Sequence, residues 1–251
     1  MLAIWFITQY KSMGSPLTVQ LIEIGPGKGT LMRDMLRTLN RFDYIRQAIE
    51  SVYLVEPSPT LRLHQQSTLS NYSKIHWTDA IEDVPEEFSF IIVHELLDAL
   101  PVFKFQLADK KWKEIKVDYG KDGSFIYALD KNETEASAAL LNSGHGSLRY
   151  DPSLFQEGDQ IEVSPEVWRI SAEIADRVQT FGGSALFVDY GKDGISDNSV
   201  RGVKDHQFCG ILDKVGECDI TADVDFGLVR DACSGSCDVY GPIKFGIFSN
   251  I

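Results

Sequence analysis

A glycine-rich segment near the N-terminus holds the residue types best suited to binding a nucleotide-like ligand. The sequence LIEIGPGKGT spans Leu21–Thr30 and continues an apolar, strand-like run. It contains Gly25, Gly27 and Gly29, and a helix-like run over 31–39 comes next. A strand, a glycine-rich turn and a helix in this order bring the backbone close to a ligand. The segment therefore predicts a ligand site at the end of the first strand.

The spacing of the glycines distinguishes between two classes of cofactor. A dinucleotide fingerprint needs G-x-G-x-x-G, which would put its third glycine at Thr30. Here the third glycine comes one position earlier, at Gly29, and the pattern is G-x-G-x-G. That spacing resembles the cofactor loop of class I methyltransferases, which bind S-adenosylmethionine. An ordinary glycine-rich turn is the alternative, because short motifs also occur by chance.

Three acidic residues at the ends of successive predicted strands could complete a nucleoside site. Glu23 lies just before the loop, where a carboxylate can face the cationic methionine end of the cofactor. Glu56 ends the second strand, where an acid can accept hydrogen bonds from both ribose hydroxyls, and Asp79 could meet the adenine amino group. Each acid alone is more often a solvated loop residue, whereas together they form one rim. The predicted cofactor-binding residues are Glu23, Gly25, Pro26, Gly27, Gly29, Glu56 and Asp79.

A second group, His94, Glu95 and Asp98, follows the fourth predicted strand and would lie over the methyl donor. Glu95 and Asp98 are three residues apart, so on a helical turn they would share a face. Paired carboxylates can grip an arginine guanidinium and orient a nitrogen lone pair for methyl transfer. The alternative is a helix N-terminus that is enriched in acid by the helix dipole. Both interpretations stay open at this point.

The elements that must position these residues alternate between strand and helix in the first half of the chain. Apolar, β-branched runs typical of buried strands lie at 19–24, 51–56, 74–77 and 88–93. Helical patterns lie at 1–10, 30–40, 42–50 and 60–69, with Thr30 as the expected N-cap of the second. This order predicts an α/β fold with a doubly wound, Rossmann-like parallel sheet.

Residues 102–163 interrupt this alternation, and we expect them to form an insertion within a single methyltransferase domain over 1–251. Runs at 102–106, 112–118 and 124–129 have the period of two that is typical of an antiparallel meander. We expect a surface loop over 131–158, a strand at 160–163, a helix from an N-cap at Ser164 to residue 180, and a buried strand at 184–190. After that the chain reads as loop-rich, with a helix at 222–232 and a strand at 238–240.

Composition narrows the possible partners. The formal net charge of −13 argues against nucleic acid, because phosphate neutralisation needs Lys and Arg. No apolar run is long enough to span a bilayer, and the first residues lack the pattern of a signal or transit peptide.

The four cysteines, Cys209, Cys218, Cys233 and Cys237, all lie in the last fifth of the chain. With His206 they could be imagined as a zinc site, but they lack a CxxC pair. We therefore expect reduced structural thiols and no metal.

Five segments together resemble the MidA-like family of bacterial and mitochondrial class I methyltransferases. They are LIEIGPGKGTLMRDMLR, YLVEPSPTLR, FIIVHELLDALPVFKFQ, ALFVDYGKDG and the run from RGVKDH to DITADVDF. The resemblance covers nearly the whole chain in matching order. It implies that Gly25, Gly27, Gly29 and Glu56 bind S-adenosyl-L-methionine, and that His94, Glu95 and Asp98 border the acceptor. The mitochondrial members suggest symmetric dimethylation of an arginine on a core subunit of respiratory complex I, an assembly role and a place in the mitochondrial matrix.

The chain also departs from that family at both ends. It begins inside the helix that follows an expected Gly-Asp-Phe-x-Thr-Ser-Pro-Glu stretch, and it leaves the family pattern after 241–244. We therefore expect a fragment, splice product or incomplete gene model without the final strands of the sheet, with weak cofactor binding and poor methylation. Two alternatives remain, a catalytically inactive assembly scaffold that keeps the fold and a Rossmann-type NAD-dependent oxidoreductase.

Overall fold

The computed structural model describes residues 1–142, 149–205, 207–212 and 215–244, and the chain divides into two compact units. Unit 1 consists of Met1–Leu97, Ile170–Asp189 and the described part of the segment from Ala232. Unit 2 consists of Asp98–Arg169 and Tyr190–Asp231. The prediction of one domain over 1–251 with an insertion at 102–163 stays a prediction.

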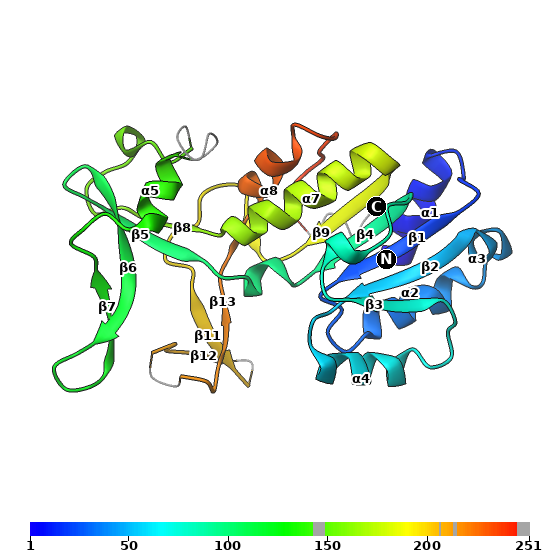
Figure 1. Cartoon of the computed structure of the whole chain (residues 1–251), viewed down its shortest axis with the longest axis horizontal. Helices are drawn as coiled ribbons and strands as arrows, with labels where there is room; N and C mark the ends of the chain where they lie inside the picture. The colour runs from blue at the N-terminus through cyan, green and yellow to red at the C-terminus, as the bar shows by residue number, and fades with distance from the viewer. Residues whose placement is uncertain (143–148, 206, 213–214, 245–251) are drawn as a thin grey trace. The chain divides into compact units, whose positions relative to one another are not determined.

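Unit 1 is built on a sheet whose strand order within the described residues is β3-β2-β1-β4-β9, with all neighbours parallel (Figure 1). The strands are β1 (Val19–Ile24), β2 (Ile49–Val55), β3 (Ile75–Thr78), β4 (Ser89–His94) and β9 (Gly183–Val188). All of β1 and most of β4 are buried, as expected for central strands covered on both faces. The predicted α/β class is confirmed. The strand order reverses between β1 and β4, which is where open parallel sheets bind ligands.

Four helices come from the N-terminal part of unit 1. They are α1 (Leu2–Ser12), α2 (Thr30–Leu39), α3 (Asp43–Ala48) and α4 (Pro59–Thr68), with 3₁₀ turns η1 (Ile81–Asp83) and η2 (Leu97–Ala99), of which η2 crosses into unit 2. A further helical segment of unit 1, residues 170–181, belongs to a helix described below. Helix α2 buries Met32, Met35, Leu36 and Leu39, a single stripe at helical spacing. The N-terminal segment is a helix, as predicted, and the ring centroid of its Phe6 lies 4.6 Å from that of Phe90 on β4. Among the helices of the described chain, none is long and apolar enough to cross a membrane.

Unit 2 contains the predicted antiparallel meander. Its strands β5 (Phe103–Ala108), β6 (Lys111–Tyr119), β7 (Phe125–Leu129) and β8 (Gln160–Val163) pair in the order β7-β6-β5-β8. Phe105, Trp112 and Ile161 are buried on one face, whereas β7 is exposed along nearly its whole length. The surface loop expected over 131–158 is only partly right, because this stretch also forms α5 (Glu135–Asn142) and the 3₁₀ turn η3 (Pro152–Leu154).

The later part of the chain holds more structure than its sequence pattern indicates. Helix α7 (Pro165–Phe181) begins in unit 2 with Ser164 as N-cap, as predicted, since Ser164 Oγ accepts the Val167 N–H at 3.3 Å. The region expected to be loop-rich forms β10 (Gly191–Lys192), β11 (Arg201–Lys204), β12 (Gln207–Cys209), β13 (Asp219–Thr221) and β14 (Val224–Asp225). These strands are too short to give a readable period.

Near the C-terminus one prediction is confirmed with a shifted start and another is wrong. The helix predicted at 222–232 is present as α8 (Phe226–Cys233), which starts later than predicted because Asp225 accepts the Leu228 N–H at 3.0 Å and caps the helix there. The strand expected at 238–240 is irregular backbone instead.

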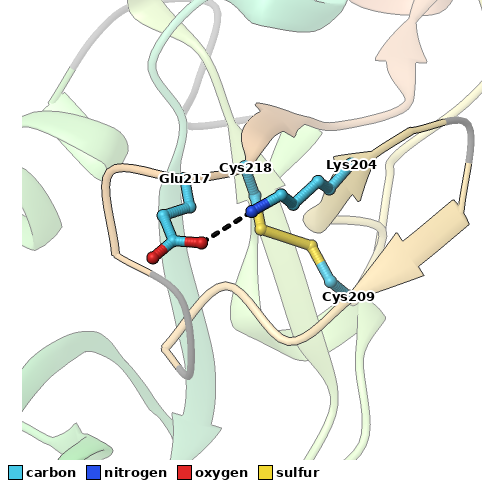
Figure 2. The surroundings of a disulfide bond; sticks show 4 residues. All are labelled: Lys204, Cys209, Glu217 and Cys218. Carbon is cyan, nitrogen blue, oxygen red and sulfur yellow. Dashed lines mark hydrogen bonds and ion pairs between the residues drawn. A yellow bond between two sulfur atoms is a disulfide. The ribbon is translucent and has the colours of Figure 1, made fainter.

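The expectation of reduced thiols is wrong for one pair of cysteines. Cys209 at the end of β12 and Cys218 just before β13 form a disulfide, beside the ion pair of Lys204 with Glu217 (Figure 2). The antiparallel pairing of β11 with both β12 and β13 brings these two cysteines together. Cys233 and Cys237 are free thiols.

The candidate zinc ligand His206 lies outside the described residues. Within the described part of the chain, no group of three or more His, Cys, Asp or Glu side chains could hold a metal ion.

Candidate cofactor site

The glycine loop follows β1 and adopts a conformation that suits glycine at each of its three positions. Gly25, Gly27 and Gly29 have φ angles of +68°, +53° and +75°, which L side chains rarely adopt. The Gly25 N–H donates to the Val55 carbonyl at 3.1 Å, so the loop is tied to the end of β2. Gly29 itself is the N-cap of α2, so the prediction that Thr30 caps this helix is wrong.

Two of these glycines also allow close packing against neighbouring elements of unit 1. A Cβ added at Gly25 would lie 2.7 Å from Leu96 Cδ1, which is closer than real side chains approach. A Cβ at Gly29 would lie 3.3 Å from Gln65 Cγ on α4. The loop is therefore held between the turn after β4 and helix α4.

Glu23 is a buried acid on β1, and no cation pairs with it among the residues that the structure describes. The residue is 3% exposed, and its Oε2 has no hydrogen-bond partner in the described part of the chain. Burial raises the pKa of this carboxyl to about 7, although a hydrogen bond from the Met32 backbone acts in the opposite direction. A buried carboxyl with one unsatisfied oxygen and a raised pKa is a candidate for binding a cationic group.

Glu56, one residue beyond β2, is buried and held in a fixed orientation. Its Oε1 accepts the backbone N–H of Ser58 at 2.9 Å, and its Oε2 accepts Gln65 Nε2 at 3.3 Å. The backbone of Glu56 is fixed as well, because its N–H donates to the Thr78 carbonyl at 3.0 Å. Each carboxylate oxygen has two lone pairs, so Glu56 keeps acceptor capacity for a ligand's hydroxyl groups.

Gln65 is a member of this site that sequence reasoning missed. Its side chain is fully buried on α4, and its Nε2 donates to the Gly27 carbonyl at 2.7 Å as well as to Glu56. Trp77 Nε1, from β3, donates to Gln65 Oε1 at 2.8 Å. A glutamine in a helix gives no sequence signal for this role, because only the fold brings it to the loop.

Asp79 lies at the outer part of the same region. Its side chain is 75% exposed and forms an ion pair with Arg62 of α4. Arg62 Nε also donates to the Glu56 carbonyl at 2.6 Å, so one guanidinium joins the backbone after β2 to the acid after β3. The structure thus brings Glu56 and Asp79 to neighbouring strand ends, as predicted.

The turn after β4 differs from the predicted helical turn. His94 is the last residue of β4 and pairs with Val188 of β9. Glu95 has φ +49° and an exposed side chain, and its N–H donates to the Val188 carbonyl at 2.9 Å. Since the 3₁₀ turn starts only at Leu97, Glu95 and Asp98 do not share a helical face.

Asp189 holds this turn in place, and it is a second residue that the sequence did not predict. Its Oδ2 accepts the backbone N–H groups of Leu96 at 3.1 Å and Leu97 at 2.8 Å. Asp189 comes directly after β9, so the rule that selected the acids after β2 and β3 could have selected it too. Asp98 belongs to unit 2, where its carboxylate accepts the Thr221 hydroxyl at 2.7 Å and its carbonyl accepts the Ala222 N–H.

A parallel sheet with a left-handed glycine loop and acids at successive strand ends fits the Rossmann-like architecture of class I methyltransferases. The model of one family, the S-adenosyl-L-methionine-dependent methyltransferases, matches residues 1–243. The chain belongs to this family, and S-adenosyl-L-methionine is the family's cofactor.

The names of curated relatives are more specific than the description of the family. The chain is 34% identical over 276 residues to the protein arginine methyltransferase NDUFAF7 homolog, mitochondrial, of Drosophila melanogaster, covering 99% of this chain and 60% of the relative. It is 34% identical over 268 residues to the human protein arginine methyltransferase NDUFAF7, mitochondrial, covering 97% and 58%. The chain thus spans about three fifths of the length of these relatives.

Solved structures show the same fold. A Burkholderia thailandensis protein superposes with a TM-score of 0.72 at 23% identity, covering 94% of this chain and 61% of that one. A second Burkholderia thailandensis structure, bound to S-adenosyl-homocysteine, has a TM-score of 0.68 at 23% identity, covering 94% and 59%.

Proposed function

We propose that this chain carries the cofactor site of a protein arginine methyltransferase. The observation that supports this most directly is the buried Glu56 carboxylate, held beside the glycine loop at the carboxyl end of β2 with acceptor capacity to spare. In the proposal Glu56 accepts both ribose hydroxyls, and the loop with Gly25, Gly27 and Gly29 lies against the cofactor. Pro26, whose carbonyl accepts the Gly29 N–H at 2.8 Å, closes this loop, and Asp79 faces the adenine.

The residues present fit S-adenosyl-L-methionine better than a dinucleotide. Above about pH 7 the Glu23 carboxyl is charged, and its Oε2 has no partner among the described residues, so it suits a ligand with a positive charge, whereas a pyrophosphate would be repelled by it. When bound, the cofactor supplies an electrophilic methyl group on a sulfonium. This electrostatic argument adds to the glycine spacing in disfavouring an NAD-dependent oxidoreductase.

On the acceptor side we propose Glu95 as the residue that binds the arginine guanidinium. Its side chain is exposed on a turn whose backbone is fixed by Val188 and Asp189, so the carboxylate is presented from a rigid support. A carboxylate orients a guanidinium through paired N–H···O bonds and favours alignment of one nitrogen for in-line transfer. By resemblance, His94 and Asp98 also border the acceptor.

The finer biological role rests on the relatives. Their names support an arginine acceptor and a mitochondrial location, and we propose the mitochondrial matrix. The family resemblance adds symmetric dimethylation of a core subunit of complex I, in support of complex I assembly. We also propose that residues 1–251 form one methyltransferase domain with an insertion at 102–163, because the parallel sheet resumes with β9 after that segment.

Methyl transfer from radiolabelled S-adenosyl-L-methionine to a complex I core subunit tests this function. We expect label on arginine, recovered as symmetric dimethylarginine. Glu95→Gln should reduce the labelling rate by a factor of about ten or more, because removing a charged hydrogen-bond partner weakens acceptor binding. Glu86→Gln, at an exposed glutamate before β4, is the matched control and should leave the rate unchanged. Label on lysine, or equal rates for the Glu95→Gln and Glu86→Gln variants, would contradict the proposal.

A further inference from the structure

We propose that Gln65 is a positioning residue that locks the ribose-binding acid and the glycine loop into one rigid cofactor cradle. The inference rests on the proposed cofactor site and adds a residue to it. Gln65 is 0% exposed, and its amide contacts three elements of unit 1. Nε2 reaches the Gly27 carbonyl at 2.7 Å and Glu56 Oε2 at 3.3 Å, while Oε1 reaches Trp77 Nε1 at 2.8 Å.

The contacts of Gln65 require a carboxamide. Two acceptors, the Gly27 carbonyl and the Glu56 carboxylate, face its nitrogen, and one donor, the Trp77 indole, faces its oxygen. An amide nitrogen carries two N–H donors, so both acceptors can be satisfied at once. Indole is a donor only, and it therefore fixes which end of the amide points toward Glu56. A glutamate at this position would keep the bond to Trp77 but would turn an acceptor toward two acceptors.

The backbone of Gln65 is placed as firmly as its side chain. Helix α4 begins at Pro59 with Ser58 as N-cap, since Ser58 Oγ accepts the Leu61 N–H at 3.3 Å. A Cβ added at Gly29 would lie 3.5 Å from Gln65 Cα, so the helix touches the loop through backbone as well. Ser58 also donates its own N–H to Glu56. One short segment therefore supplies both of the groups that orient the Glu56 carboxylate.

Gln65 thus links Gly27 of the glycine loop to Glu56, which lies 29 residues further along the chain. If Glu56 is held in place before the ligand arrives, its carboxylate need not be ordered on binding, which increases affinity. Loss of the Gln65 amide should therefore weaken binding of any ligand that carries the ribose. A residue that only stabilised the fold would lower the melting temperature without changing the Kd of the folded protein.

Isothermal titration of the 251-residue chain with S-adenosyl-homocysteine tests this inference. We expect Gln65→Glu to raise the Kd by about tenfold or more, because it removes two hydrogen bonds and adds a like charge beside Glu56. Gln66→Glu, which places the same charge at the next, exposed position of α4, should change the Kd by less than about twofold. Trp77→Phe keeps an aromatic ring but loses the donor that orients the amide, and it should raise the Kd by about threefold.

The outcomes separate the inference from the proposed function. A Gln65→Glu chain that shows a lower melting temperature or binding stoichiometry with an unchanged Kd would overturn the inference alone. If Gln65→Glu does not fold, Trp77→Phe decides, and a Kd equal to that of the wild type would overturn it. A wild-type chain that binds no S-adenosyl-homocysteine would overturn the cofactor site and the inference with it.

Discussion

The buried carboxylates of the two units differ in what holds them. In unit 2, Glu162 is paired with Lys104 at 3.1 Å and also accepts the Ser199 and Val200 N–H groups at 2.8 and 3.2 Å. Asp225, also in unit 2, is paired with Arg149. In the described part of unit 1, Glu23 has an oxygen with no partner and Glu56 has only neutral donors.

This difference separates structural acids from ligand-binding acids. A buried charge is tolerated when a cation and hydrogen bonds compensate its lost hydration, and such pairs fix the local structure. An uncompensated buried acid destabilises the fold, and it is retained where a ligand supplies the missing charge. By this criterion Glu162 and Asp225 organise unit 2, whereas we propose that Glu23, with an oxygen left without a partner, and Glu56, with neutral donors only, bind a cofactor.

The largest expected effect is on stability, in unit 2. Lys104→Met leaves the Glu162 carboxylate buried without its cation, and we expect the free energy of unfolding to fall by about 3 to 5 kcal/mol. Urea denaturation measures this change. Lys192→Met, which breaks the exposed pair with Asp197, is the control and should change stability by less than about 1 kcal/mol. Equal losses in the two variants would show that burial of the pair does not matter.

Glu23 should make the free energy of unfolding depend on pH. Its folded pKa of about 7 lies above the ordinary value of 4.5, so the folded state binds the proton more tightly than the unfolded state. The stability that this proton confers is fully present below pH 4.5. It is lost as the pH rises through about 7, and the free energy of unfolding then falls by at most about 3 kcal/mol. Glu23→Gln should remove this loss, as measured by urea denaturation from pH 4.5 to pH 8. The same slope in both chains would rule out Glu23 as its source.

The smallest of these effects is on affinity alone. Glu56→Gln cannot accept two ribose hydroxyls in the same way, and we expect the Kd for S-adenosyl-homocysteine to rise about tenfold. Glu50→Gln, at an exposed position of β2, serves as the control in the same titration and should bind like the wild type. An unaltered Kd for Glu56→Gln would assign Glu56 to structure, like Glu162.

How much of this site the sequence could predict depends on the distance over which each residue acts. Glu23 and Glu56 were predictable because each sits at the end of an apolar strand, so local pattern and sheet geometry place them. Gln65 acts on Gly27 across 38 residues and looks like any polar residue of a helix. The turn at Glu95 was predicted as helical because acid spacing alone does not reveal a left-handed residue.

The elements of the fold also differ in how far the sequence predicts them. The long, nearly all-apolar strands of unit 1 could be predicted from their composition, and the β5–β7 meander from its period of two. The short strands β10 to β14 and the Cys209–Cys218 disulfide depend on contacts between segments that carry no periodic signal of their own. The N-caps at Gly29 and Asp225 are different, because they act within the local chain, and an Asp at an N-cap position is a signal that the sequence does carry.

The central claim is that Glu23 and Glu56, the buried acids of unit 1 that have no cationic partner among the described residues, bind S-adenosyl-L-methionine. Calorimetric titration of the wild-type chain at pH 8 with S-adenosyl-L-methionine, and separately with NADH, tests it most directly. We predict saturable one-to-one binding of S-adenosyl-L-methionine with a Kd below about 1 mM, and no binding of NADH in the same range. Tighter binding of NADH, or no heat from S-adenosyl-L-methionine up to that concentration, would contradict the account.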